Sequence, residues 1–421
     1  MRSRNHRTAG MRGMSRRGLL KCTLGAAGAC LVPRAALGGP GKTAPSDRIT
    51  LGFIGTGGQG THQLRSFLGF DEVRVLAVCD TVKDRRERAR DLVQKRYGTP
   101  SGRKGCDVGS DFRQIIARDD IEAVCIATQD HWHALIAVAA AKAGKDMYCE
   151  KPLGVAFTEG RAIVQAVRRY RQVFQTGTQQ RSSRNFRFAC ELARNGYLGK
   201  VHTVVVGAPG PSYRRSYRGP VTPEPVPPGM DYEMYVGPAP MKPYNRGRLD
   251  WPGWYLIWDY CAGFIVNWGV HHLDIANWGC PDVGGKPFEL TCKGTYRNDG
   301  LSDNINAWQA EYVYPGGLRM TFTDTGHPNA QGCKFVGPDG WVHVNRGGIQ
   351  AAPKSLLKVA LKGDDLRLHE SGHVASGLGL LGEVAARVGR KLKWDPAAEK
   401  FIGDDRANRL LTRPMRSPWT L

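Results

Sequence analysis

A glycine-rich turn directly behind an apolar segment is the feature that most constrains the fold of this chain. Residues 49–55 are apolar enough to predict a buried strand, and Gly55-Thr56-Gly57-Gly58-Gln59-Gly60 follows with GxGxxG spacing. The next apolar segment, residues 73–80, ends at Asp80, twenty residues beyond Gly60. A strand, a glycine turn that opens a helix and an acidic residue at this distance are typical of a βαβ unit that binds a dinucleotide.

Each part of this motif has a physical task in the predicted unit. Gly55 permits the tight turn, Gly57 lets a pyrophosphate approach the backbone, and Gly60 lets helix and strand pack closely. Asp80 is expected to bind the ribose hydroxyls, which favours NAD, while basic residues within 83–86 leave NADP open. The alternative is a glycine-rich turn without a ligand. The predicted cofactor residues here are Gly55, Thr56, Gly57, Gly58, Gln59, Gly60 and Asp80.

Apolar segments alternate with helical segments in the first part of the chain. Predicted strands cover residues 49–55, 73–80, 123–128, 146–150 and 173–176. Predicted helices cover residues 58–69, 84–97, 133–143 and 158–171, and a glycine-rich loop covers 98–110. Strands that alternate with helices in this way predict a Rossmann-type, doubly wound parallel sheet, here assigned to residues 48–180.

Beyond residue 180 the pattern changes. Helices are predicted at residues 185–195, 264–278 and 377–390, and strands at 200–208, 288–297, 307–313, 318–324, 334–336 and 341–345. Successive strands without intervening helices predict an α+β domain with a largely antiparallel open sheet, covering residues 181–421.

The first 38 residues contain eight basic residues and no acidic one, within a net charge of +22 for the chain. Ser15-Arg16-Arg17 precedes a weakly apolar stretch that ends at small residues near 38, which is typical of a signal peptide. The paired arginines resemble a twin-arginine signal, and residues 39–47 form a linker. We therefore expect an exported, periplasmic protein; a basic disordered tail is the alternative.

Composition excludes several classes of protein. With 41% hydrophobic and 23% charged residues the chain is globular. Its longest apolar run is about a dozen residues, shorter than the ~20 that span a bilayer. No concentrated basic run follows the leader, so nucleic-acid binding is not expected. The eleven cysteines form no CxxC pair, which disfavours a zinc ribbon.

Polar residues follow two further predicted strands, at the carboxyl edge where open α/β sheets bind ligands. Lys151 is the candidate for chemistry, because burial beside a cationic nicotinamide would lower its pKa from ~10.4 and let it share a proton with a substrate hydroxyl. The alternative is that Lys151 pairs with Glu150. The residues expected at the cofactor from these segments are Thr128, Asp130, His131, His133, Glu150 and Lys151.

Together these segments resemble the Gfo/Idh/MocA family of glucose–fructose oxidoreductase and inositol dehydrogenase relatives. The resembling motifs are the GxGxxG and residues 128–133, 143–152 and 263–274. The resemblance implies a Rossmann domain followed by a sheet-rich domain whose sheet often forms homodimers or homotetramers. It also implies that Lys151 is the catalytic lysine and His271 the catalytic histidine.

The segment around His271 departs from the family at Asn267, where many members carry Asp. An amide can orient a histidine but adds no charge. His271 and Asp274 are three residues apart on a predicted helix and are expected to share a face toward the substrate, whereas the direction of His272 stays open. A metal site formed by histidines and Asp274 has no recognisable spacing, so none is expected. The predicted substrate residues are Asn267, Asp274, His272 and Trp268.

Five of the ten tryptophans lie between residues 251 and 278. Aromatic faces stack on the C–H faces of sugars, so this cluster favours a small carbohydrate-like substrate. A large aromatic core is the alternative.

These observations predict an NAD- or NADP-dependent oxidoreductase acting on a CH–OH group of a sugar, polyol or related carbohydrate. Lys151 would hold the reacting oxygen and His271 would take its proton, with Asn267 and Asp274 positioning the histidine and neighbouring hydroxyls. Because free NAD is scarce outside the cytoplasm, an exported enzyme is expected to retain its cofactor and recycle it in the site. A glycoside hydrolase, lyase or epimerase that oxidises its substrate transiently is one alternative, and a non-catalytic sugar-binding protein is another.

Overall fold

The computed structural model describes residues 43–98, 105–211, 222–296, 300–325, 331–368 and 375–421. The predicted signal peptide and most of the linker lie outside these ranges. The chain divides into two compact units, residues 1–48 and residues 49–421, and the second unit contains the elements discussed below. Within the described ranges, no helix combines the length and the apolar character needed to cross a membrane.

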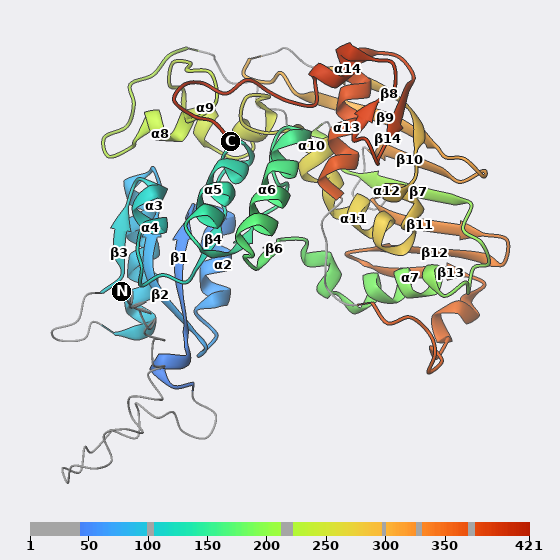
Figure 1. Cartoon of the computed structure of the whole chain (residues 1–421), viewed down its shortest axis with the longest axis horizontal. Coiled ribbons are helices and arrows are strands. Elements are labelled where there is room, and N and C mark those ends of the chain that lie inside the picture. Colours follow the sequence, from blue (N-terminus) through green and yellow to red (C-terminus); the bar gives the residue numbers. More distant parts are fainter. Residues whose placement is uncertain (1–42, 99–104, 212–221, 297–299, 326–330, 369–374) are drawn as a thin grey trace, which may run out of the picture. The chain divides into compact units, whose positions relative to one another are not determined.

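The first domain is built on a six-stranded parallel sheet in the order β3-β2-β1-β4-β5-β6 (Figure 1). Its strands are β1 (Ile49–Ile54), β2 (Val73–Cys79), β3 (Asp107–Gly109), β4 (Ala123–Ile126), β5 (Asp146–Cys149) and β6 (Phe174–Thr176). Its helices are α2 (Gly58–Phe67), α3 (Lys83–Tyr97), α4 (Phe112–Ile116), α5 (Asp130–Lys142) and α6 (Phe157–Tyr170). The predicted doubly wound parallel sheet is confirmed.

Two elements of this domain were not predicted, and one begins elsewhere. β3 has three residues, none of them buried, so no apolar pattern marks it; pairing with β2 makes it a strand. α4 is a single short helix capped by Asp111, whose carboxylate accepts from the Arg113 N–H at 2.9 Å. α5 begins at Asp130 rather than near residue 133, so the polar residues 130–133 occupy its first turn.

The second domain contains a nine-stranded sheet in the order β13-β12-β11-β7-β10-β9-β8-β14-β15. Its strands are β7 (Thr203–Ala208), β8 (Phe288–Tyr296), β9 (Ile305–Val313), β10 (Arg319–Asp324), β11 (Gly332–Gly337), β12 (Gly340–Asn345), β13 (Gly348–Ala352), β14 (Leu392–Asp395) and β15 (Lys400–Phe401). Only the β7–β10 pair is parallel, which confirms the predicted α+β domain. The unpredicted strands β13, β14 and β15 are short and lie at the two ends of the sheet.

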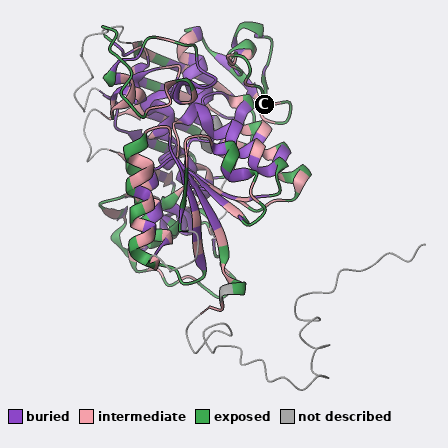
Figure 2. Ribbon diagram, turned by 90° about the vertical axis from the view of Figure 1, so that its left-hand side faces the viewer, coloured by how far each residue is buried: buried purple, intermediate pink, exposed green. Residues whose placement is uncertain are grey.

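Helices of the second domain pack on one face of this sheet. α7 (Arg184–Arg194), α11 (Gly269–Gly279) and α13 (Ala375–Val388) contact its strands. Figure 2 shows the buried residues gathered in the interior of the fold and the exposed residues on its outside. The predicted helix 264–278 is two helices, α10 (Gly263–Asn267) and α11, that meet at Trp268. The remaining short helices are η3 (Gln179–Ser182), α8 (Tyr232–Val236), α9 (Arg246–Leu249), η5 (Gly253–Leu256), α12 (Asp282–Gly285), η7 (Lys354–Lys358) and α14 (Asp405–Arg409). The homo-oligomer expected from the resemblance stays a prediction.

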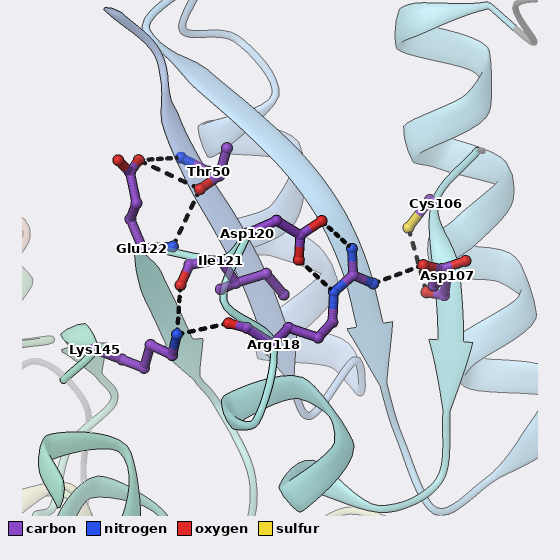
Figure 3. Close-up of polar contacts among 8 residues, drawn as sticks. All are labelled: Thr50, Cys106, Asp107, Arg118, Asp120, Ile121, Glu122 and Lys145. Atoms are coloured by element: carbon purple, nitrogen blue, oxygen red, sulfur yellow. Dashed lines mark hydrogen bonds and ion pairs between the residues drawn. The ribbon is translucent and has the colours of Figure 1, made fainter. Parts of the chain in front are cut away.

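Polar contacts tie together the amino edge of the parallel sheet, away from its ligand edge (Figure 3). The ammonium of Lys145, which is buried just before β5, donates to the carbonyl oxygens of Arg118 at 2.6 Å and Ile121 at 2.8 Å. Glu122 accepts from the Thr50 N–H at 2.9 Å and joins the starts of β4 and β1. Lys145 therefore stabilises the fold, and the carboxyl edge of the sheet remains for ligands.

Candidate functional site

A cavity of about 460 Å³ lies between the carboxyl edge of the parallel sheet and the helices α10 and α11. The predicted site residues that line it are Gly55, Gly57, Gly58, Gln59, Asp80, Thr128, Asp130, His133, Glu150, Lys151, Asn267, Trp268 and His271. The predicted site residues that do not line it are Thr56, Gly60, His131, His272 and Asp274. The structure thus brings the nucleotide turn and both candidate catalytic groups to one cavity.

The glycine turn is shaped for close approach of another backbone or a ligand. Gly55 has a φ of +88°, and a Cβ there would lie 2.6 Å from the Ala127 carbonyl group, so only glycine fits. A Cβ on Gly60 would lie 2.0 Å from the Gly55 carbonyl oxygen. A Cβ on Gly57 would approach only the Arg85 guanidinium, at 3.9 Å, so the space beside Gly57 is open to the cavity. The protein itself does not require glycine at position 57, whereas a bound pyrophosphate does.

Asp80 faces the same cavity from the end of β2. Its carboxylate accepts from the N–H groups of Thr56 at 2.8 Å and Val82 at 2.9 Å, which orients it and leaves lone pairs for hydroxyl donors. Thr56 does not line the cavity, and it contributes to the site by orienting the Asp80 carboxylate. Of the downstream basic residues, Arg85 lines the cavity, whereas Arg86 donates to the Asp80 backbone carbonyl at 3.0 Å. The turn, the start of α2 and Asp80 together fit a dinucleotide.

Lys151 follows β5 and extends toward the second domain. Its ammonium donates to the side-chain oxygen of Asn267 at 2.5 Å and to the Asn267 carbonyl oxygen at 3.2 Å. Burial lowers the pKa of Lys151 below its ordinary 10.5. The carboxylate of Glu150 instead accepts from Gln59 at 3.1 Å and Gln63 at 2.7 Å, so the alternative pairing of Lys151 with Glu150 is not found. The lysine is held by a neutral amide and still faces the cavity.

Asn267 is the centre of a buried polar network. Its Nδ2 donates to both carboxylate oxygens of Asp130, each at 2.9 Å, and its Oδ1 accepts from Lys151 and from the Tyr255 hydroxyl. These partners set the orientation of the amide, because a flip would place its oxygen against the carboxylate. Burial raises the pKa of Asp130. The carboxylate of Asp130 thus lies one hydrogen bond away from the amide that holds the lysine.

His271 lies in the first turn of α11 and lines the cavity. Its Nδ1 is buried and has no hydrogen-bond partner in the described part of the chain. Burial, followed by the positive charges of Lys151 and Arg346, holds the pKa of His271 well below its ordinary 6.5. A neutral imidazole that lines the cavity can accept a proton from a bound hydroxyl.

Asp274 and His272 lie away from the cavity, which corrects the expectation that Asp274 shares a face with His271. The Asp274 carboxylate accepts two hydrogen bonds from Arg181, at 2.6 and 2.7 Å, in a buried ion pair. His272 lies against Gln180, whose Nε2 is 3.3 Å from its Nδ1, and burial lowers its pKa to about 3. Residues three apart on a helix still differ by ~60° in direction. Nearly every residue of α11 is buried, so side chains that point in different directions from this helix contact different neighbouring elements.

The two histidines at the start of α5 contact backbone carbonyl groups. The ring nitrogens of His131 lie 3.2 and 3.3 Å from the carbonyl oxygens of Tyr260 and Tyr235, and burial lowers its pKa to about 4. His133 lies between two carbonyl oxygens in the same way, that of Pro152 being 2.6 Å from its Nδ1. Among the residues with described positions, no group of three or more His, Cys, Asp and Glu could hold a metal ion.

The cavity wall contains side chains that were not found from the sequence, among them the polar Gln179 and Arg346. Gln179 lies in η3, and Arg346 lies in the turn between β12 and β13. Arg346 belongs to no motif and follows no strand of the parallel sheet, whereas Gln179 follows β6 closely without belonging to a motif. Tyr255 lies within the tryptophan-rich segment 251–278, but no sequence signal shows its hydroxyl bond to Asn267. Arg346 and Tyr255 reach the cavity only because the second domain packs against the first.

Comparison with known families agrees with this architecture. Residues 49–178 match the family described as "Oxidoreductase family, NAD-binding Rossmann fold", and residues 189–421 match "Oxidoreductase family, C-terminal alpha/beta domain". The chain belongs to the Gfo/Idh/MocA family of oxidoreductases. Its first domain is therefore the NAD-binding Rossmann domain of a Gfo/Idh/MocA protein, and the nine-stranded sheet belongs to the C-terminal domain of that family.

Individual Gfo/Idh/MocA relatives match part of the chain. A glycosyl hydrolase family 109 protein of Shewanella pealeana is 28% identical over 193 residues, which are 45% of this chain and 42% of that protein. The myo-inositol 2-dehydrogenase of Thermotoga maritima is 27% identical over 191 residues, 45% of this chain and 49% of that protein. The chain thus matches less than half the length of these curated relatives.

Solved structures share the fold over most of the chain. The WlbA dehydrogenase from Bordetella pertussis, in complex with NADH and UDP-GlcNAcA, aligns with a TM-score of 0.57 at 17% identity, covering 82% of this chain and 98% of that one. The aldose-aldose oxidoreductase from Caulobacter crescentus, complexed with glycerol, aligns with a TM-score of 0.56 at 18% identity, covering 82% and 99%. At these identities the likeness shows the Gfo/Idh/MocA fold.

Proposed function

We propose that this Gfo/Idh/MocA protein transfers a hydride between NAD and the CH–OH carbon of a sugar, polyol or related carbohydrate. The observation that carries the proposal is the shared cavity, whose wall contains the glycine turn and Asp80 together with Lys151 and His271. Asp80 favours NAD, because the 2′-phosphate of NADP would meet its negative charge. The inositol dehydrogenase and glycosyl hydrolase relatives support a carbohydrate substrate.

The chemistry divides among a few groups. When bound, the nicotinamide supplies a carbon that accepts or returns a hydride. Lys151 donates a hydrogen bond to the substrate oxygen, in place of one of its bonds to Asn267. The neutral imidazole of His271 takes the hydroxyl proton as the hydride leaves the carbon, so the alcohol becomes a neutral carbonyl compound. In the reverse direction His271 returns that proton.

The surrounding residues position these groups and shape the pocket. Asp130 holds the amide of Asn267, which in turn holds the ammonium of Lys151 at the cavity wall. Trp251, Trp254 and Tyr255 line the same cavity. Such faces stack on the C–H faces of a sugar ring and exclude water from the reacting carbon.

We propose further that the protein is exported with its cofactor in place. The support is the twin-arginine pattern at residues 16 and 17, which lies outside the described ranges. A protein that relies on a scarce soluble cofactor would stop after one turnover. The retained cofactor must therefore be recycled in the site by a second substrate or by re-reduction of the first.

The second candidate function is hydrolysis, elimination or epimerisation through transient oxidation. The relatives named glycosyl hydrolase family 109 proteins favour it. Lys151 and His271 would act in this reaction as well. Oxidation at one carbon makes the C–H group of the neighbouring carbon acidic, and the hydride afterwards returns to the oxidised carbon. The net reaction would leave the cofactor in its original state.

Purification of the folded protein and its absorbance spectrum test both proposals. We expect bound nicotinamide that survives dialysis, and a change in its near-ultraviolet absorbance when a carbohydrate is added. Protein that is free of nicotinamide and binds NAD weakly would overturn retention. No change with any carbohydrate would overturn hydride transfer. Cleavage or epimerisation of the carbohydrate without net cofactor reduction would favour the second candidate.

A further inference from the structure

Two arginines of the described cavity wall, Arg85 and Arg346, have no ion pair with an acidic residue, and Arg346 is the one near the candidate catalytic groups. Arg346 lies in the turn between β12 and β13 and contributes to the wall that contains Lys151 and His271. Its guanidinium carbon lies 4.7 Å from the centroid of the Trp268 ring, so the indole supports the guanidinium plane. Within the described ranges, Arg346 makes no hydrogen bond and no ion pair. Its N–H donors are free for a molecule in the cavity.

Three arginines with buried or half-buried side chains have carboxylate partners. Arg181 pairs with Asp274 at 2.6 Å, and Arg387 and Arg413 lie 2.9 and 4.0 Å from the carboxylate of Glu383. These three also lie over the rings of tryptophans, as Arg346 does. Arg346 therefore lies over a tryptophan ring as these three arginines do, but it has no carboxylate partner in the described part of the chain.

The charge of Arg346 acts on the candidate catalytic groups. It contributes to lowering the pKa of Lys151 and of His271, and burial lowers its own pKa below the ordinary 12.5. The nearby carboxylates are engaged with side-chain amides: Asp130 with Asn267, and Glu150 with two glutamines. These two carboxylates act electrostatically on Lys151, but none in the described wall forms an ion pair with Arg346.

We propose that Arg346 binds an anionic group of the substrate, which makes the substrate a sugar acid or a sugar phosphate. The inference rests on the proposed function and narrows its substrate class. A guanidinium presents two parallel N–H donors, which match the oxygens of a carboxylate or a phosphate. Trp268 holds that fork in place, so the anion orients the carbohydrate while its hydroxyl carbon lies at Lys151 and His271.

The test compares pairs of carbohydrates that differ by one charged group. Glucuronate and glucose 6-phosphate are each compared with glucose, and gluconate with sorbitol, by the fluorescence change of the bound nicotinamide and by KM and kcat. The variants are Arg346→Gln, which removes the charge, and Arg346→Lys, which keeps the charge but loses the fork. Arg90→Gln removes an exposed guanidinium from α3 and is the matched control. Thermal unfolding shows that each variant is folded.

In the wild-type protein we expect at least one acid or phosphate to bind tighter than its neutral partner. Arg346→Gln should raise the KM of that anion by ~10–100-fold, the loss expected for a charge-assisted hydrogen bond, with a smaller rise in Arg346→Lys. Neutral sugars and the Arg90→Gln protein should be unaffected. Tighter binding of glucuronate or gluconate would identify a sugar acid as the substrate, and tighter binding of glucose 6-phosphate would identify a sugar phosphate.

Two outcomes would overturn the inference alone. Neutral sugars could elicit the cofactor response while every anion fails to bind more tightly, or Arg346→Gln could weaken anions and neutral sugars equally. If no carbohydrate of either kind changes the nicotinamide signal, the proposed function fails together with the inference.

Discussion

The cofactor and substrate regions of the cavity are built in different ways. The cofactor region is largely backbone: the contiguous turn 55–60 sets its shape, and Asp80 adds one carboxylate held by backbone N–H groups. The substrate region consists of side chains from both domains, among them Lys151 after β5 and His271 in α11. A turn forms from consecutive residues, whereas these side chains meet only when the domains pack together.

Charge is also handled differently in the two regions. Backbone donors orient Asp80 directly. In the substrate region a neutral amide, Asn267, separates the buried carboxylate of Asp130 from the ammonium of Lys151. Substitutions in the cofactor region should therefore act through shape, and substitutions in the substrate region through protonation and hydrogen bonding.

The largest effect is expected for Lys151→Met, which removes the ammonium but leaves the glycine turn unchanged. The rate of hydride transfer should fall by ~10²–10⁴-fold, the usual contribution of a general acid or base. Bound nicotinamide should be retained. Single-turnover kinetics and the absorbance of the purified protein measure the two quantities, with Arg90→Gln as a control. Loss of the cofactor together with activity would show that the two regions do not act separately.

Two alanine substitutions in the glycine turn should have the opposite effect to Lys151→Met, because they act on cofactor binding or stability and leave Lys151 and His271 unchanged. A Cβ on Gly60 meets the Gly55 carbonyl oxygen at 2.0 Å, so Gly60→Ala should lower the free energy of unfolding by ~3 kcal/mol. Gly57→Ala has room in the protein and should change stability by less than ~0.5 kcal/mol, yet it should lose bound nicotinamide. Urea unfolding and the cofactor content of each variant test this. Equal stability losses in both variants would contradict the shape argument.

Asn267→Asp tests the amide between the charges. It places a second carboxylate within hydrogen-bond distance of Asp130, and like charges so close cannot both ionise. We expect the rate above neutral pH to fall by ~10-fold, equivalent to ~1.4 kcal/mol. The double variant Asp130→Asn with Asn267→Asp restores a single carboxylate and should recover most of the rate. Full activity of Asn267→Asp alone would argue against the network.

The smallest effect is expected in the pH profile. Protonation of His271 removes the base, and its pKa lies well below 6.5, so this loss begins only at lower pH. The value of kcat/KM should change by less than ~2-fold between about pH 8 and about pH 6.5. His271→Gln is the control, because it abolishes the base at every pH. An acid limb centred near 6.5 that disappears in His271→Gln would contradict the role of burial.

The turn, the parallel sheet and the following antiparallel sheet could be predicted from the sequence because they depend on local patterns. Glycine spacing and apolar strands are properties of neighbouring residues. The position of Asp274 could not be predicted in this way, since its partner Arg181 comes from η3. The short strand β3 also escaped prediction, because hydrogen bonds to β2 rather than its own residues make it a strand.

By itself, the sequence of this chain determined a dinucleotide turn, a parallel sheet and a following antiparallel sheet. Only the tertiary structure decided that Asp130 holds Asn267, that Asp274 pairs with Arg181, and that Arg346 faces the cavity without a carboxylate. The physical reason is that periodicity records which side of an element is buried, whereas the partner of a buried polar group depends on which distant element packs there.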